Sequence, residues 1–151
     1  MASWNDFASA EPDFSRRVLD IFVTQKHMTL ATLRRDGSPR ISGTEANVIE
    51  GELVLGMMPG SLKARDLTRD PRMALHSPTF DPPEDDPSAW RGDAKIAGVA
   101  IEDLAKDPGD ASHRFVIDIT EIALTKVGTP PDHLVIESWS PDRGLRRRQR
   151  Q

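Results

Sequence analysis

Short apolar segments separated by tight turns fill residues 28–76, and this pattern limits the possible folds more than any other feature. The segment Met-Thr-Leu-Ala-Thr-Leu-Arg at residues 28–34 predicts a strand. Asp36-Gly37 is typical of a hairpin turn, and residues 40–48 predict the returning strand. A second turn at Glu50-Gly51 leads into a further strand over residues 53–58. Local returns of this kind favour antiparallel pairing.

The pattern continues to the end of the chain and predicts an antiparallel β-barrel. Further strands are predicted over residues 72–76, 93–102, 113–127 and 133–139, and short helices over residues 12–26 and 61–69. In residues 113–127 the apolar side chains move from odd positions to even ones, which predicts a β-bulge near Thr120-Glu121. Six or more strands joined mostly by tight turns indicate a mainly β (α+β) barrel with short flanking helices.

Length and composition fit one small domain. Only 37% of the 151 residues are hydrophobic, which leaves room for a partner subunit to complete part of the core. The absence of cysteine excludes disulfides, thiolate metal sites and cysteine nucleophiles. No apolar run is long enough to span a membrane, and the N-terminus lacks a signal-peptide pattern. We therefore expect a cytoplasmic protein that contacts no membrane.

The distribution of charged residues and prolines indicates how the rest of the chain is organised. The net charge of −4 argues against a nucleic-acid partner. Residues 1–142 are expected to form the single domain, and the arginine-rich residues 143–151 a flexible tail. The proline-rich residues 77–92 predict an irregular loop in which substrate specificity lies. The four histidines show no metal-ligand spacing, so no metal site is expected.

Residues 40–47 form an unusual strand because polar side chains fall on both of its faces. An unpaired buried polar group costs about 1–3 kcal/mol, so a ligand or a subunit interface would have to satisfy these side chains. The alternative is an edge strand that faces solvent. The strand alone does not decide between the two interpretations.

The helix that begins at Ser61 carries cations in its first turns. Ser61 and Lys63 could donate hydrogen bonds to a phosphate, with Arg65 close by, at the helix end that favours anions. The alternative is an ordinary capped helix with a solvated basic face. A hairpin that brings the polar strand close to this helix start favours the ligand interpretation.

Two motifs in this order resemble a known family. The sequence reads T-L-A-T-L-x-x-D-G-x-P at residues 29–39, then a hairpin, then S-x-K-x-x-x-L-x-x-D-P-R at residues 61–72. This arrangement resembles the pyridoxamine 5′-phosphate oxidase-like split-barrel family of flavin and deazaflavin binders. The resemblance implies an antiparallel six-stranded split β-barrel with Greek-key features, FMN or a deazaflavin coenzyme as cofactor, and a homodimer with cofactor sites at its interface.

The resemblance also implies which residues contact the cofactor. The strand along the flavin ring would comprise Arg40, Ile41, Ser42, Gly43 and Thr44, and the end of the next strand would contribute Met57 and Met58. Ser61 and Lys63 would bind the phosphate, assisted by Arg65. Trp139 would reach the cofactor of the partner subunit.

Two departures from the family pattern limit the expected reaction. Leu62 stands where the pyridoxamine oxidases have an arginine, and residues 140–144 replace their Arg/His substrate motif. Oxidation of pyridoxamine phosphate itself is therefore not expected. The resemblance implies an oxidoreductase acting on an unidentified small molecule, with hydride chemistry supplied by the cofactor and no catalytic side chain assigned. The alternative is a non-catalytic carrier of flavin, haem or another tetrapyrrole.

Overall fold

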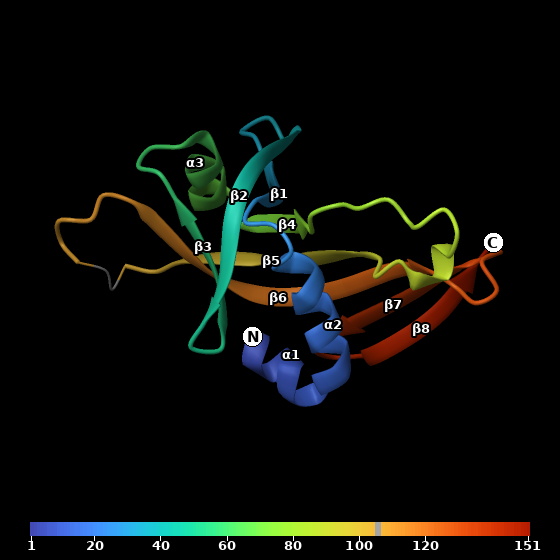
Figure 1. Ribbon diagram of the computed structural model, residues 1–151. Coiled ribbons are helices and arrows are strands. Elements are labelled where there is room, and N and C mark those ends of the chain that lie inside the picture. Colours follow the sequence, from blue (N-terminus) through green and yellow to red (C-terminus); the bar gives the residue numbers. More distant parts are fainter. Residues whose placement is uncertain (105–106) are drawn as a thin grey trace.

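One antiparallel sheet of eight strands dominates the computed structural model, which describes residues 1–104 and 107–151 (Figure 1). The strands are β1 (Met28–Leu33), β2 (Pro39–Ile49), β3 (Glu52–Met57), β4 (Arg72–His76), β5 (Asp93–Glu102), β6 (His113–Val127), β7 (Leu134–Ser140) and β8 (Gly144–Arg150). The helices are α1 (Trp4–Ala10), α2 (Pro12–Phe22) and α3 (Leu62–Arg69), and a 3₁₀ turn covers Pro87–Ala89.

Six of the strands close into a barrel. The sheet order is β3-β2-β1-β4-β5-β6-β7-β8, and β3 also pairs with β6. The first part of β6 pairs with β3, whereas its last part pairs with β7. The hairpin of β7 and β8 therefore extends from the barrel wall without taking part in closure. The predicted mainly β fold with a closed six-stranded antiparallel barrel is confirmed.

The predicted bulge is present in β6. Ala97 pairs with Glu121 and Gly98 pairs with Ile119, so Thr120 is the extra residue. Strands β5 and β6 approach each other closely here: a Cβ added at Gly98 would lie only 2.5 Å from the Asp118 carbonyl oxygen. The bulge thus bends β6 where the barrel closes.

An aromatic cluster joins the N-terminal helices to the barrel. Phe7 packs edge-on against Trp4 and Phe14, and its ring centroid lies 4.9 Å from that of Trp139. The sequence analysis missed α1, which begins with a capping box between Ser3 and Asp6. The predicted helix over residues 12–26 ends at Phe22. Figure 1 shows α1 and α2 far from α3, at the other end of the barrel.

The arginine-rich end is a strand, which corrects the expectation of a flexible tail. Strand β8 pairs with β7 along its whole length, from Gly144 opposite Ser140 to Arg150 opposite Leu134. Gly144 allows the tight return because its φ is 69°, a conformation that side chains rarely adopt. Pairing uses backbone groups, so this exposed strand needs no apolar alternation, and hydropathy could not reveal it.

Candidate functional site

A groove beside the first turn of α3 contains five of the residues that the sequence singled out. We call it the Lys63 groove. It measures about 580 Å³ and is lined by His27, Gly43, Thr44, Glu45, Asn47, Gly56, Met57, Met58, Pro59, Lys63 and Ser112. Strand β2 contributes Gly43, Thr44, Glu45 and Asn47. Met57 ends β3, and Met58 follows it. The hairpin therefore brings polar strand and helix start together, as expected.

The start of α3 fixes one cation at the wall of this groove. The Ser61 side chain caps the helix by accepting a hydrogen bond from the Ala64 backbone N–H at 3.4 Å. The Lys63 ammonium donates to the Gly43 carbonyl oxygen at 2.7 Å. Lys63 thus bridges α3 and β2, whereas the Ser61 oxygen is engaged in the cap.

Two glycines leave part of the groove without side chains. Gly43 on β2 and Gly56 on β3 both line it, and Glu45 pairs with Gly56 across the two strands. A Cβ added at either glycine would meet no atom within 4 Å. The adjacent Met58 side chain is 79% exposed. A flat ring therefore has room to lie against these two strands.

Arg40 and Arg65 lie in a second groove, which we call the arginine groove. It measures about 900 Å³ and is lined by Arg34, Arg35, Asp36, Arg40, Gly60, Leu62, Arg65, Asp66, Thr68, Arg69 and His113. Residues two apart on a helix point to different faces, so Lys63 and Arg65 cannot converge on one phosphate. Within the described part of the chain, the side chains of Arg35 and Arg65 make no hydrogen bond or ion pair.

A buried carboxylate holds α3 against β1 and β2. The Asp66 Oδ2 atom accepts hydrogen bonds from Thr32 Oγ1 at 2.8 Å and Arg40 Nε at 2.7 Å, and Oδ1 accepts one from Arg69 at 3.2 Å. Burial works to raise the pKa of Asp66, but these hydrogen bonds outweigh it and hold the pKa below its ordinary value. Asp66 is therefore a structural anion that positions the helix carrying Lys63.

Four of the predicted residues line neither groove, and one of them is Ser61, whose side chain caps α3. Ile41 is 75% exposed, and Ser42 is half-buried on the same strand. Trp139 is only 4% exposed and packs against Phe7 in the core. The polar residues of β2 differ in burial: Thr44 is buried, whereas the other polar residues of the strand are partly or fully exposed.

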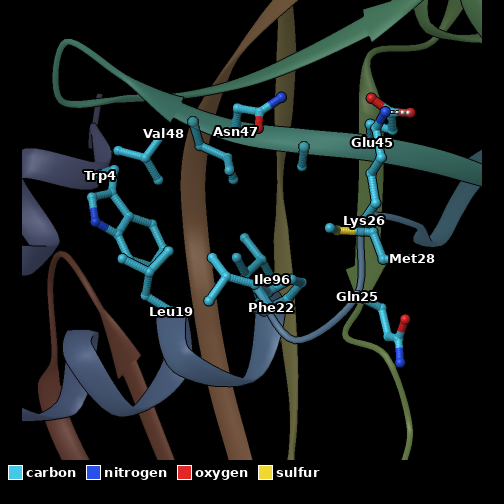
Figure 2. Close-up of a pocket in the computed structure, with 13 residues that line it drawn as sticks. Trp4, Leu19, Phe22, Gln25, Lys26, Met28, Glu45, Asn47, Val48 and Ile96 are labelled. Carbon is cyan, nitrogen blue, oxygen red and sulfur yellow. Dashed lines mark ion pairs between the residues drawn. The ribbon is translucent and has the colours of Figure 1, made fainter.

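A third hollow lies between α2 and β2, and the sequence analysis did not anticipate it. This β2 cavity of about 400 Å³ is lined by Trp4, Leu19, Phe22, Val23, Gln25, Lys26, Met28, Glu45, Ala46, Asn47, Val48, Leu53 and Ile96 (Figure 2). Trp4, which forms one wall of the cavity, belongs to α1. The Ser-x-x-Asp capping signal at Ser3 predicts a helix here, so it was the sequence feature that could have indicated this wall. Among the described residues, no three His, Cys, Asp or Glu side chains are grouped so that they could hold a metal ion, and no described helix is long and apolar enough to cross a membrane.

Known proteins agree with this fold. No protein-family model and no curated protein matches the chain. A solved pyridoxamine 5′-phosphate oxidase-related FMN-binding protein from Nostoc punctiforme is 12% identical, covers 100% of this chain and 98% of its own, and has a TM-score of 0.63. An F420 reductase is 16% identical, with coverage of 68% and 93% and a TM-score of 0.51.

A heme-binding protein from Mycobacterium smegmatis is also similar, with 13% identity, coverage of 89% of this chain and 85% of its own, and a TM-score of 0.51. Identities this low establish the fold and nothing finer. The chain therefore has the split-barrel fold that its two motifs suggested. The three similar proteins name three different cofactors, so the fold by itself does not select one.

Proposed function

We propose that this protein binds a flavin-type cofactor, FMN or a deazaflavin, in the Lys63 groove and acts as an oxidoreductase on a small molecule. The observation that carries the proposal is the Lys63 ammonium held beside two side-chain-free positions, Gly43 and Gly56. A cation and a flat, open surface within one groove fit a phosphate and a planar ring.

The residues present fit such a cofactor in different ways. Lys63 would exchange its bond to the Gly43 carbonyl for a charge-assisted bond to the phosphate. The glycine surface would support the ring, and Met57 and Met58 would contact its edge. When bound, the cofactor supplies the hydride chemistry, and this chain's residues bind it, orient it and exclude water from one of its faces.

The proposal includes a homodimer with cofactor sites at the interface. Exposed apolar residues line both grooves: Met58, in the Lys63 groove, is 79% exposed, and Leu62, in the arginine groove, is 55% exposed. Ile41, on β2 outside both grooves, is 75% exposed. Exposed apolar groups gathered around a site are typical of surfaces that a partner covers. Sedimentation velocity should give the mass of two chains, and a single-chain mass at micromolar concentration would contradict this part.

Cofactor titration tests the proposal directly. The absorption spectrum of the purified protein should show a flavin band, or one should appear on titration with FMN or deazaflavin side by side. Turnover is then assayed with reduced deazaflavin and with NAD(P)H. Saturable binding without any turnover would favour a carrier, and no binding of either cofactor would refute the proposal.

A haem or tetrapyrrole carrier is the second candidate. His27 lines the Lys63 groove, its side chain is 71% exposed, and its Nε2 atom lies 3.3 Å from Glu45 Oε1. The imidazole would exchange this contact for the iron if it served as an axial ligand. A Soret band that disappears in His27→Ala would support this candidate. A Soret band identical to that of free haem would exclude it.

A further inference from the structure

The β2 cavity has the composition of a small-molecule site. Its floor consists of apolar side chains, and Trp4, Phe22 and Ile96 are each at most 6% exposed. Figure 2 shows these side chains below β2, facing the space between that strand and α2. Its volume of about 400 Å³ lies within the range of about 300–1,000 Å³ that is usual for ligand pockets.

The mouth of the cavity is polar but carries no net charge. Lys26 lies 3.6 Å from Glu45 in an ion pair that Figure 2 marks with a dashed line. These two residues are the charged members of the lining, and their charges cancel. Among the described residues, the side-chain amides of Gln25 and Asn47 have no hydrogen-bond partner, and Figure 2 shows the Asn47 amide on the side of β2 away from the apolar floor. Such a mouth favours an uncharged ligand over an anion or a cation.

The cavity adjoins the Lys63 groove through a shared wall. Glu45 and Asn47 line both hollows, and both belong to β2. A molecule in the cavity would therefore lie next to whatever occupies the groove. The cavity has no cation free to bind a phosphate, so the two hollows suit different ligands.

We propose that the β2 cavity binds an uncharged, mostly apolar ring compound whose single carbonyl or hydroxyl group lies at the neutral mouth. The apolar floor takes the ring, and the neutral mouth takes the single polar group. The binding site stands on the cavity alone. Such a compound would be the substrate if a cofactor occupies the Lys63 groove, and this part rests on the proposed function.

The test uses the full chain without any cofactor and 1-naphthol as the probe. Calorimetric titration should show saturable binding, and 1-naphthoate, a carboxylate on the same ring system, should bind at least tenfold more weakly. In nitrogen-15 NMR spectra, 1-naphthol should shift the Trp4 indole signal and leave that of Trp90 in place. Absent binding, a preference for the carboxylate, or a shift confined to Trp90 would each overturn the proposal.

A matched pair of variants locates the bound probe. Leu19→Trp fills the cavity and should weaken 1-naphthol binding at least tenfold, whereas Asp20→Trp adds the same side chain at an exposed neighbouring position of α2 and should change it little. Equal affinities for the two variants would overturn the proposal. Because no cofactor is added, binding of 1-naphthol together with failure of FMN titration would separate this site from the proposed function.

Discussion

Two buried carboxylates attach helices to different parts of the sheet, Asp66 to the barrel and Glu137 to the β7–β8 hairpin outside it, and they differ in what they hold in place. Asp66 binds side chains from β1, β2 and its own helix α3, and its side chain is 4% exposed. Glu137 on β7 accepts two hydrogen bonds of 2.8 Å from Arg17 on α2, and its side chain is 9% exposed. Both are paired anions, but only Asp66 lies on the helix that carries Lys63.

The surroundings of the two carboxylates differ as well. Glu137 lies beside two cations, Arg17 and, at 3.9 Å, Lys126, and the Arg17 guanidinium lies 5.3 Å from the Phe14 ring centroid. Asp66 lines the arginine groove, and the helix that carries it begins beside the Lys63 groove. Both carboxylates thus pair with arginine side chains. The pair of Glu137 attaches α2 to β7, whereas the pairs of Asp66 hold the helix that carries Lys63 against the barrel. Removing each carboxylate should separate a structural role from a site-positioning role.

The largest expected effect is on stability. Asp66→Ala leaves Arg40 and Arg69 without their buried partner, so it should lower the free energy of unfolding by about 3–5 kcal/mol. Glu137→Ala should cost less, about 1.5 kcal/mol, because the Arg17 side chain is 38% exposed and water can replace the lost bonds. Urea denaturation followed by circular dichroism measures both. A larger loss for Glu137→Ala would reverse the comparison.

Acid should remove both contributions. Hydrogen bonds from Arg17 hold the pKa of Glu137 below its ordinary value, and the pKa of Asp66 is also lowered, because its hydrogen bonds outweigh its burial. Groups with a depressed folded-state pKa stabilise the protein fully above their unfolded pKa of about 4 and lose that contribution as the pH falls further. Denaturation between pH 7 and pH 2 should therefore show falling stability below about pH 4. The Asp66→Asn and Glu137→Gln variants should each show a shallower fall, and slopes equal to wild type would contradict this assignment.

The smallest expected effect distinguishes the two regions by ligand binding. Asp66→Asn keeps the shape of the side chain but weakens the anchor of α3, so FMN affinity should fall a few-fold, or about 1 kcal/mol. Glu137→Gln, the matched change at the other end, should leave FMN affinity within experimental error. Fluorescence titration on folded protein measures both. Equal losses would mean that Asp66 has no special role at the groove.

The sequence predicted the strands well because alternation and turn residues are local signals. The phase change around Thr120 even located the bulge. Local signals failed where tertiary structure decides. Strand β8 is held by pairing with β7, Trp139 is buried by α1, and Arg65 is separated from Lys63 by the geometry of the helix. Of the residues in the two motifs, Lys63 lines the Lys63 groove, whereas the β2 cavity depends on packing between distant segments.

The central claim is that Lys63 binds the phosphate of a flavin-type cofactor. The most direct test compares FMN with riboflavin, which lacks the phosphate, on wild type, Lys63→Ala and the control Arg65→Ala. Charge-assisted hydrogen bonds are worth about 1.5–3 kcal/mol, so wild type should bind FMN at least about tenfold more tightly than riboflavin. Lys63→Ala should abolish that preference, and Arg65→Ala, on another helix face, should retain it. Equal affinity of wild type for the two flavins, or a preference that survives in Lys63→Ala, would contradict the account.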